Sequence, residues 1–221
     1  MNAAHLVPFS LALANAACGM AVQQAELKAK AADDSPELGA PLAVGGTIHP
    51  NIRATLDGTA SPSLLLVSGH PEIVSAEDGK LTGRSPGMTA ILVTTREGVV
   101  VDFHHLWVER ATRATLHRLY ADGREMGEVS GHIDVILGEP LYLTPKLYFG
   151  AQELAGAVEG KWSVEPPLVH IYDEGVAQRR RLVAERPGVA VLRLELPGAE
   201  AQVSFRVVDP NARKEVPEGA T

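Results

Sequence analysis

Residues 84–95 read RSPGMTAILVTT, and residues 185–196 read ERPGVAVLRLEL. In each copy a Pro-Gly pair precedes a run rich in aliphatic and β-branched residues, which favour strands. The two Pro-Gly pairs are 101 residues apart, which is a typical length for one domain. Alternate residues of a strand share a face. The residues expected to face a core are therefore Thr89, Ile91 and Val93 in the first copy and Ala190, Leu192 and Leu194 in the second.

Short apolar runs separated by turn residues surround both copies. Strands are expected at Leu64–Val67, Ile73–Ala76, Met88–Thr95, Val99–Val108, Arg113–Tyr120 and Ala201–Val208. Asp78-Gly79 and Asp122-Gly123 favour hairpin turns, because Gly tolerates positive φ. No stretch between residues 41 and 208 keeps a helical period, and Ala151–Gly160 is expected to be a loop or a single turn. This pattern indicates an all-β chain built from sandwiches.

The strand expected at Val99–Val108 has two unlike faces. One carries Val101, Phe103 and Trp107, and the other carries Val100, Asp102, His104, Leu106 and Val108. A strand that is apolar on one face and mixed on the other suits a sandwich whose outer side is partly covered.

Five pieces of the first half follow one another in a characteristic order: LAVGGT at 42–47, PEIVS at 71–75, GKLTG at 79–83, PGMTAI at 86–91 and a closing Val-rich strand. In this order and spacing, residues 42–108 resemble the bacterial immunoglobulin-like domain of the group-2 type, which is common in bacterial surface proteins. The second half repeats the scheme with ILGEP at 136–140, WSVEP at 162–166 and ERPGVAV at 185–191. Trp162 stands where this family usually carries Trp, whereas the first half has Leu66-Val67-Ser68 there. The resemblance implies two tandem immunoglobulin-like β-sandwich domains.

The chain is accordingly divided into a signal peptide (1–17), a flexible tether (18–40), a first sandwich (41–111), a second sandwich (112–209) and a disordered tail (210–221). The junction near Glu109–Thr112 contains no Pro or Gly, so we expect it to be short and stiff. Because each sandwich should have its own core, two separate melting transitions are expected.

The N-terminus has the features of an export signal. Residues 1–17 contain no Asp, Glu, Lys or Arg, and Leu6–Ala14 is an apolar run too short to span a bilayer as a helix. Ala14-Asn15-Ala16 resembles a cleavage site. The segment Ala16-Ala17-Cys18-Gly19 also resembles a bacterial lipoprotein signal, although Asn15 stands where that class favours Leu. Cys18 is therefore a candidate for lipidation, and a buried N-terminal helix with a structural cysteine is the alternative.

Charge and cysteine content restrict the possible partners. The net charge is −7, so a nucleic acid would be repelled on average. The main local exception, Arg179-Arg180-Arg181, is expected to be a solvated strand or loop, because no aromatic residues interleave with it in the sequence. Cys18 is the one cysteine, so no intramolecular disulfide can form.

Few motifs suggest a specific chemistry. Gly83-Arg84-Ser85-Pro86-Gly87 matches the nucleophile elbow G-x-S-x-G of serine hydrolases, but a strand rather than a helix is expected after it. His104 and His105 are adjacent on a strand, so they should point to opposite faces and cannot chelate one ion together. Acidic residues sit at turns without a D-x-D-x-D run, and no cofactor-binding loop is present. We expect no catalytic residue, metal or cofactor.

Four aromatic residues, Tyr142, Tyr148, Phe149 and Trp162, cluster in the first part of the second sandwich. Such a group could form a platform for carbohydrate or protein, and more often it is part of a core. The function expected is that of a non-catalytic, extracytoplasmic immunoglobulin-like protein acting as an adhesive, spacer or binding module. Its partner would be another surface protein or a carbohydrate, and a lipid on Cys18 would be its contact with a membrane. A serine hydrolase using Ser85 and a carbohydrate-binding accessory module are the alternatives.

Overall fold

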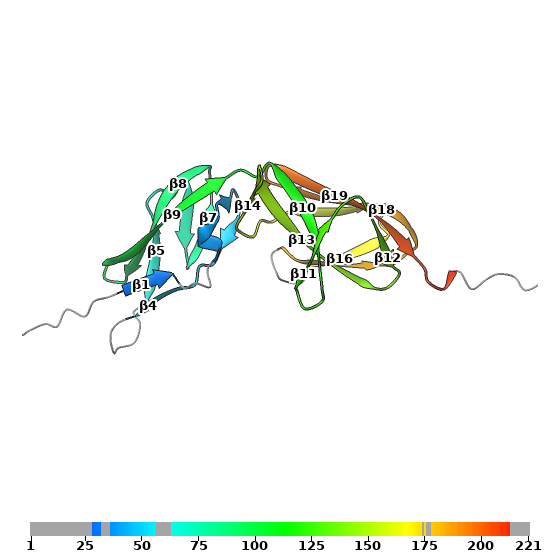
Figure 1. Ribbon diagram of the computed structural model, residues 1–221, viewed down its shortest axis with the longest axis horizontal. Coiled ribbons are helices and arrows are strands. Elements are labelled where there is room, and N and C mark those ends of the chain that lie inside the picture. The colour runs from blue at the N-terminus through cyan, green and yellow to red at the C-terminus, as the bar shows by residue number, and fades with distance from the viewer. Residues whose placement is uncertain (1–27, 32–35, 56–62, 174, 176–177, 213–221) are drawn as a thin grey trace, which may run out of the picture.

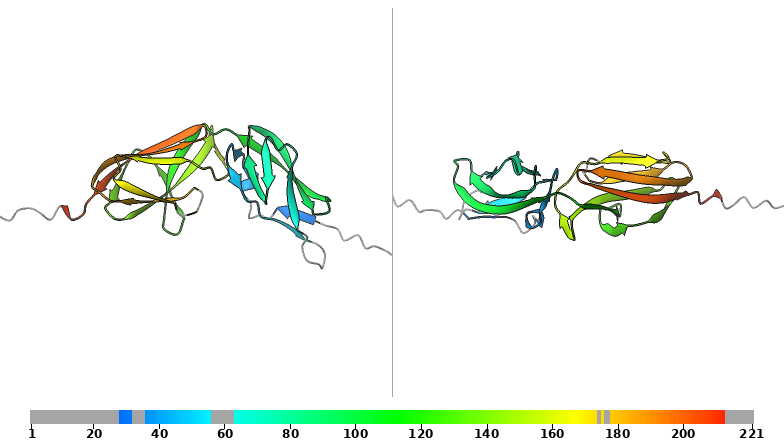
Figure 2. Two further views of the ribbon diagram at one scale, coloured as in Figure 1. Left: turned by 180° about the vertical axis from the view of Figure 1, so that it is seen from behind. Right: turned by 90° about the horizontal axis from the view of Figure 1, so that it is seen from above.

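The computed structural model describes residues 28–31, 36–55, 63–173, 175 and 178–212. In this part of the chain the regular elements are β-strands, apart from the short 3-10 helix η1 (Pro36–Gly39). Figures 1 and 2 show two β-sandwiches that follow one another along the long axis of the molecule. The all-β fold with two sandwiches in tandem that the sequence predicts is confirmed.

The first sandwich packs a four-stranded sheet against a three-stranded one. The first sheet has the order β2-β9-β8-β5 and the second has the order β3-β7-β6, while β1 pairs with β4. The strands are β1 (Lys28–Ala31), β2 (Leu42–Ala43), β3 (Thr47–Ile48), β4 (Ile52–Thr55), β5 (Leu64–Ser68), β6 (Val74–Glu77), β7 (Lys80–Gly83), β8 (Gly87–Thr95) and β9 (Val100–Glu109).

The second sandwich is larger. Its first sheet has the order β11-β10-β13-β17-β16, with β14 paired to β13, and its second has the order β12-β19-β18-β15. The strands are β10 (Arg113–Leu119), β11 (Glu125–Val129), β12 (His132–Ile136), β13 (Pro140–Phe149), β14 (Gln152–Leu154), β15 (Lys161–Glu165), β16 (Val169–Asp173), β17 (Arg180–Ala184), β18 (Gly188–Leu196) and β19 (Ala199–Val208).

The two sandwiches repeat one topology. In each, a first strand pairs in parallel with the closing strand: β2 with β9, and β12 with β19. A glycine at positive φ follows that strand in both halves, Gly45 at 80° and Gly138 at 81°. The Pro-Gly turns are also equivalent, since Gly87 (φ 149°) begins β8 and Gly188 (φ 143°) begins β18. The second half differs in its opening hairpin β10–β11, which precedes the repeated unit.

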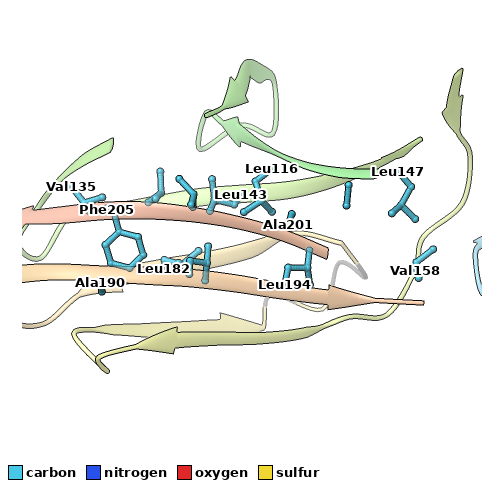
Figure 3. Packing of buried hydrophobic residues seen from close by; sticks show 14 of the residues in the cluster. Leu116, Val135, Leu143, Leu147, Val158, Leu182, Ala190, Leu194, Ala201 and Phe205 are labelled. Carbon is cyan, nitrogen blue, oxygen red and sulfur yellow. The ribbon is translucent and has the colours of Figure 1, made fainter. Parts of the chain in front are cut away.

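Each half has its own apolar cluster, and alternation within strands builds it. Ile91 and Val93 of β8 and Leu192 and Leu194 of β18 are fully buried, as the repeated stretch predicts. Figure 3 shows the cluster of the second half, where Phe205 and Leu194 lie between the two sheets. The buried residues of the first cluster are Leu42, Ile48, Val74, Leu81, Ile91, Leu106 and Val108.

Two segments differ from expectation. Residues 18–40 were expected to be a flexible tether, but strand β1 lies within them and pairs with β4. Hydrogen bonds between the backbone groups of β1 and β4 give this segment a regular structure, although its composition is polar. Ala151–Gly160 was expected to be a loop or a single turn, but it contains strand β14. The residues that follow β14, Ala155–Ala157, form backbone hydrogen bonds to the first sandwich.

The junction is held by backbone hydrogen bonds as well as by the linker. The amide of Ala43 donates to the carbonyl oxygen of Ala155 at 2.9 Å, and Thr47 and Ala157 exchange two bonds of 2.9 and 2.8 Å. Ala155 packs against the first cluster, while Ala43 belongs to the second. Within the linker, Ala111 is buried. The junction therefore combines a short linker with backbone hydrogen bonds between the two sandwiches, and its stiffness stays a prediction.

Candidate binding face on the first sandwich

The outer face of the sheet β2-β9-β8-β5 carries a continuous group of apolar side chains. Strand pairing places Met88 beside Trp107, Leu92 beside Phe103, and Val67 beside Leu92. We call this group, on three neighbouring strands, the apolar face. Its residues are Leu65, Val67, Met88, Ala90, Leu92, Phe103, His105 and Trp107.

The apolar face is uncovered in the part of the chain that the structure describes. Phe103 is 56% exposed and Trp107 is 53% exposed, although both are large aromatic residues. None of its members is Asp, Glu, Lys or Arg, and Glu109 is the first acidic residue past Trp107 along β9. Exposed apolar patches of this kind are typical of interaction sites.

The sequence pattern suggested that the apolar face of β9 meets the core and that its mixed face is the outer one, and this interpretation is wrong. Leu106 and Val108, on its mixed face, are buried in the core, and Phe103 and Trp107, on its apolar face, point outward. Alternation separates the two faces of a strand but does not say which one meets the opposite sheet. The core accepts the mixed face because Asp102 and His104 lie in the first half of β9, where both side chains keep part of their surface in solvent.

The rings on this face have a defined arrangement. Phe103 and His105 meet edge to face, with ring centroids 5.4 Å apart. His105 stands between Phe103 and Trp107 on the same side of β9, because alternate residues share a face. A polar ring therefore interrupts an otherwise apolar row and supplies a hydrogen-bonding group there.

The aromatic residues of the second sandwich are arranged differently. Each of the four tyrosines of the chain lies beneath an arginine guanidinium, at 4.1–5.1 Å from the ring centroid. These cation–π pairs join Arg113 to Tyr148, Arg124 to Tyr120, Arg179 to Tyr142 and Arg181 to Tyr172. The usual frequency of such pairs is about one per 70–80 residues. The second sandwich has four such pairs, which stabilise the sheet β11-β10-β13-β17-β16. Two of them place an arginine over Tyr142 and Tyr148, which the sequence suggested as part of a binding platform.

One sequence expectation is corrected by these pairs. Arg179 and Arg181 are not simply solvated, since tyrosines from β13 and β16 lie under them. Trp162 is half-buried and packs against the core, while Phe149 is 46% exposed at the end of β13. The predicted aromatic group thus does not form a single surface.

A polar network lies on the sheet β11-β10-β13-β17-β16 of the second sandwich. His117 is buried, and its Nε2 lies 2.9 Å from Thr115 Oγ1, while its Nδ1 lies 2.6 Å from Glu125 Oε1. The Lys146 ammonium, 2.9 Å from Glu125 Oε2, holds the pKa of the Glu125 carboxyl below its usual value by hydrogen bonding. The same contact raises the pKa of Lys146.

This network has the order hydroxyl, imidazole, carboxylate found in hydrolytic triads. A nucleophile must be reached by its substrate, but the Thr115 side chain is buried beneath its neighbours. The network therefore ties β10, β11 and β13 together. Sequence reasoning missed it, and the alternation of Thr115 and His117 on one strand face was the signal available.

Ser85 lies between two strands. Its hydroxyl donates to the carbonyl oxygen of Glu72 at 2.6 Å, and Pro86 leads directly into β8. A nucleophile elbow needs a helix after the serine, whose N-terminus stabilises developing negative charge. Ser85 therefore occupies a turn in which its proton is already donated to the backbone.

The remaining candidates fall in several places. Cys18 and the expected signal at 1–17 lie outside the described residues, as do residues 213–221 of the expected tail. His104 and His105 lie on opposite sides of β9. Within the described residues, His, Cys, Asp and Glu form no group of three that could hold a metal ion, and no helix is long and apolar enough to cross a membrane.

A cleft of about 640 Å³ lies at the junction of the sandwiches. Thr47, Lys80 and Thr82 of the first sandwich line one side, and Glu159 and Pro197 of the second line the other. Its polar groups are exposed and of both signs, so they select no single ligand charge.

No family model and no curated protein sequence matches the chain. Similar solved structures include domains 4 and 5 of the S-layer protein SbsC, with 16% identity, a TM-score of 0.30, and coverage of 83% of this chain and 98% of that one. The D00-D0 domain of Intimin has 8% identity, a TM-score of 0.31 and coverage of 83% and 100%. The Escherichia coli adhesin FdeC has 12% identity, a TM-score of 0.34 and coverage of 84% and 63%.

Proposed function

We propose that the chain is a non-catalytic, extracytoplasmic immunoglobulin-like protein that acts as a binding module of the cell envelope. The observation that carries this proposal is the apolar face: within the described part of the chain, an uncovered group of side chains that contains no Asp, Glu, Lys or Arg. Exposing Phe103 and Trp107 to water is unfavourable, since burying such a side chain is worth about 1.5–3 kcal/mol. A partner that covers the face gains the part of that free energy that belongs to the exposed half of each side chain.

The apolar face is suited to recognition because its framework is fixed. Trp107 and Phe103 stand on one strand, β9, which is hydrogen-bonded to β8 along most of its length. Little backbone ordering is needed on binding, so less of the contact energy is lost to entropy. Adhesive and spacer roles are both compatible with this face.

The location outside the cytoplasm is part of the same proposal. Support comes from the charge-free apolar start and from the small residues before Cys18. Mass analysis of the N-terminus of the protein from its own host tests it. A chain starting at residue 17 or 18 is expected, and a diacylated Cys18 would show a lipid anchor. An intact Met1 would overturn export.

Binding is tested with the cell-envelope fraction of the same host. The full chain is mixed with washed envelopes, sedimented, and compared with the variants Phe103→Ala and Trp107→Ala. Both variants are expected to stay in the supernatant, whereas Phe149→Ala, an exposed aromatic change on the second sandwich, should sediment like the original protein. Equal sedimentation of all four proteins would show that the apolar face is not the contact surface.

A further inference from the structure

We propose that the apolar face binds an extended, uncharged, β-1,4-linked polysaccharide. This inference rests on the proposed function and specifies the ligand of the same face. It follows from the size of the face, from its lack of charge, and from the position of its two large aromatic rings.

The apolar face is smaller than a stable protein–protein interface. It covers three strands about 4.8 Å apart and about eight residues of about 3.3 Å each, or about 400 Å². A stable protein interface needs about 800 Å² from each partner. A second copy of the chain would therefore bury about half of what a lasting dimer requires, whereas a narrow linear ligand needs no more than the area available.

The lack of charge restricts the ligand chemistry. The side chains between Phe103 and Trp107 on β9, and their neighbours on β8 and β5, contain no carboxylate, ammonium or guanidinium. An anionic or cationic ligand would lose water on this face without gaining an opposite charge, which is unfavourable. A neutral ligand loses only the hydration of its apolar surface and of the hydroxyls it turns inward.

The two exposed rings set the shape of the ligand. Phe103 and Trp107 are four residues apart on one strand face, or about 13 Å along β9. This distance exceeds the width of one sugar ring, so a ligand that contacts both must be a chain. Equatorial β-1,4 linkages give such a chain two flat sides on which C–H groups point outward, and these groups pack against the electron-rich faces of aromatic rings.

Polar groups at fixed positions complement the apolar contacts. His105 lies between the two rings, and its edge contact with Phe103 holds its orientation. Glu109 stands past Trp107 at the end of the row. A sugar chain presents hydroxyls along its edges, so it can bond to these groups while its flat side covers the rings.

The test uses the full chain, cellohexaose and chitohexaose as probes, and titration calorimetry as the measurement. Binding to either oligosaccharide is expected, and the two arms distinguish a plain hexose chain from one of N-acetylhexosamine. Trp107→Ala and Phe103→Ala should each weaken binding about tenfold or more, as truncation of a central aromatic residue does. Phe149→Ala should bind like the original protein, and circular dichroism checks that each variant is folded.

Several results would overturn the inference. Failure of both hexasaccharides would exclude this ligand class, and if the Trp107→Ala protein also failed to sediment with envelopes, the binding face itself would still stand with a different ligand. Tighter binding to polygalacturonate than to the neutral probes would replace the neutral ligand by an anionic one. Loss of a dimer on Trp107→Ala substitution, seen by analytical ultracentrifugation, would make a second copy the occupant.

Discussion

Leu192 lies in the middle of β18, fully buried between the sheets of the second sandwich. Leu192→Ala should lower the free energy of unfolding by about 2–5 kcal/mol, because it removes apolar contacts and leaves a cavity. Val189→Ala on the same strand is the matched control, since Val189 is 58% exposed. Urea unfolding measures both. A Leu192→Ala protein as stable as the control would mean that the strand does not use this face for its core.

Glu125 gives a pH dependence with a defined sign. Its pKa is lowered from 4.5 in the folded protein, mainly by the hydrogen bond from Lys146. A lowered folded pKa stabilises the protein above the ordinary value, and this stabilisation is lost as the pH falls below about 4.5. The unfolding free energy of Glu125→Gln should therefore fall less between pH 5 and pH 3 than that of the original protein. Urea titrations at each pH measure it, with Glu200→Gln, an exposed change on β19, as control.

At the scale of the element, the Pro-Gly turn sets where the strand of the repeated stretch begins. Gly188 has φ 143°, and a Cβ there would lie 2.8 Å from Leu168 Cδ1. Gly188→Ala should cost about 1–3 kcal/mol from backbone strain, with the contact adding to it. Gly131→Ala has positive φ but open space around it, so it should cost less. Thermal melting of both variants compares them, and equal losses would show that the contact with Leu168 is unimportant.

The strands were largely predictable from the sequence because their determinants are local. The run after Pro187-Gly188 alternates inward leucines with Arg193 and Glu195, so its two faces could be assigned without any neighbour. The faces of β9 offered no such guide, since the outward Phe103 and Trp107 are as apolar as the core. Hydrophobicity alone then favours burial, and only the position of the opposite sheet shows otherwise.

Contacts between distant strands were not predictable. Tyr172 meets Arg181 because β16 and β17 are paired in a particular register. The carboxylate of Glu125 reaches His117 across a hairpin whose register shifts by one residue. The candidate binding face depends in the same way on pairing among β5, β8 and β9. Sequence alternation supplies the members of such a group, and strand register brings them together.

At the scale of the whole molecule, the junction changes the expected unfolding behaviour. Each sandwich has its own core, which by itself favours the two separate melting transitions expected from the sequence. The segment after β14 belongs to the second sandwich, yet its backbone pairs with Ala43 and Thr47 of the first. Unfolding either sandwich breaks these bonds and leaves buried backbone groups of the other without partners, which is unfavourable. The two sandwiches should therefore melt as one coupled unit.

Gly156→Ala tests this coupling. Gly156 has φ 99°, and a Cβ there would lie 2.6 Å from Leu42 Cδ1 and 3.1 Å from backbone atoms of Gly46. The added methyl group has no room unless the crossing segment moves away from the first sandwich, so calorimetry should resolve two transitions in place of one. Gly150→Ala, also at positive φ but with open space, should keep the single transition. Two transitions already present in the original protein would mean that the backbone bonds at the junction contribute too little to join the sandwiches. The apolar face would then be carried by a domain that moves independently of the second.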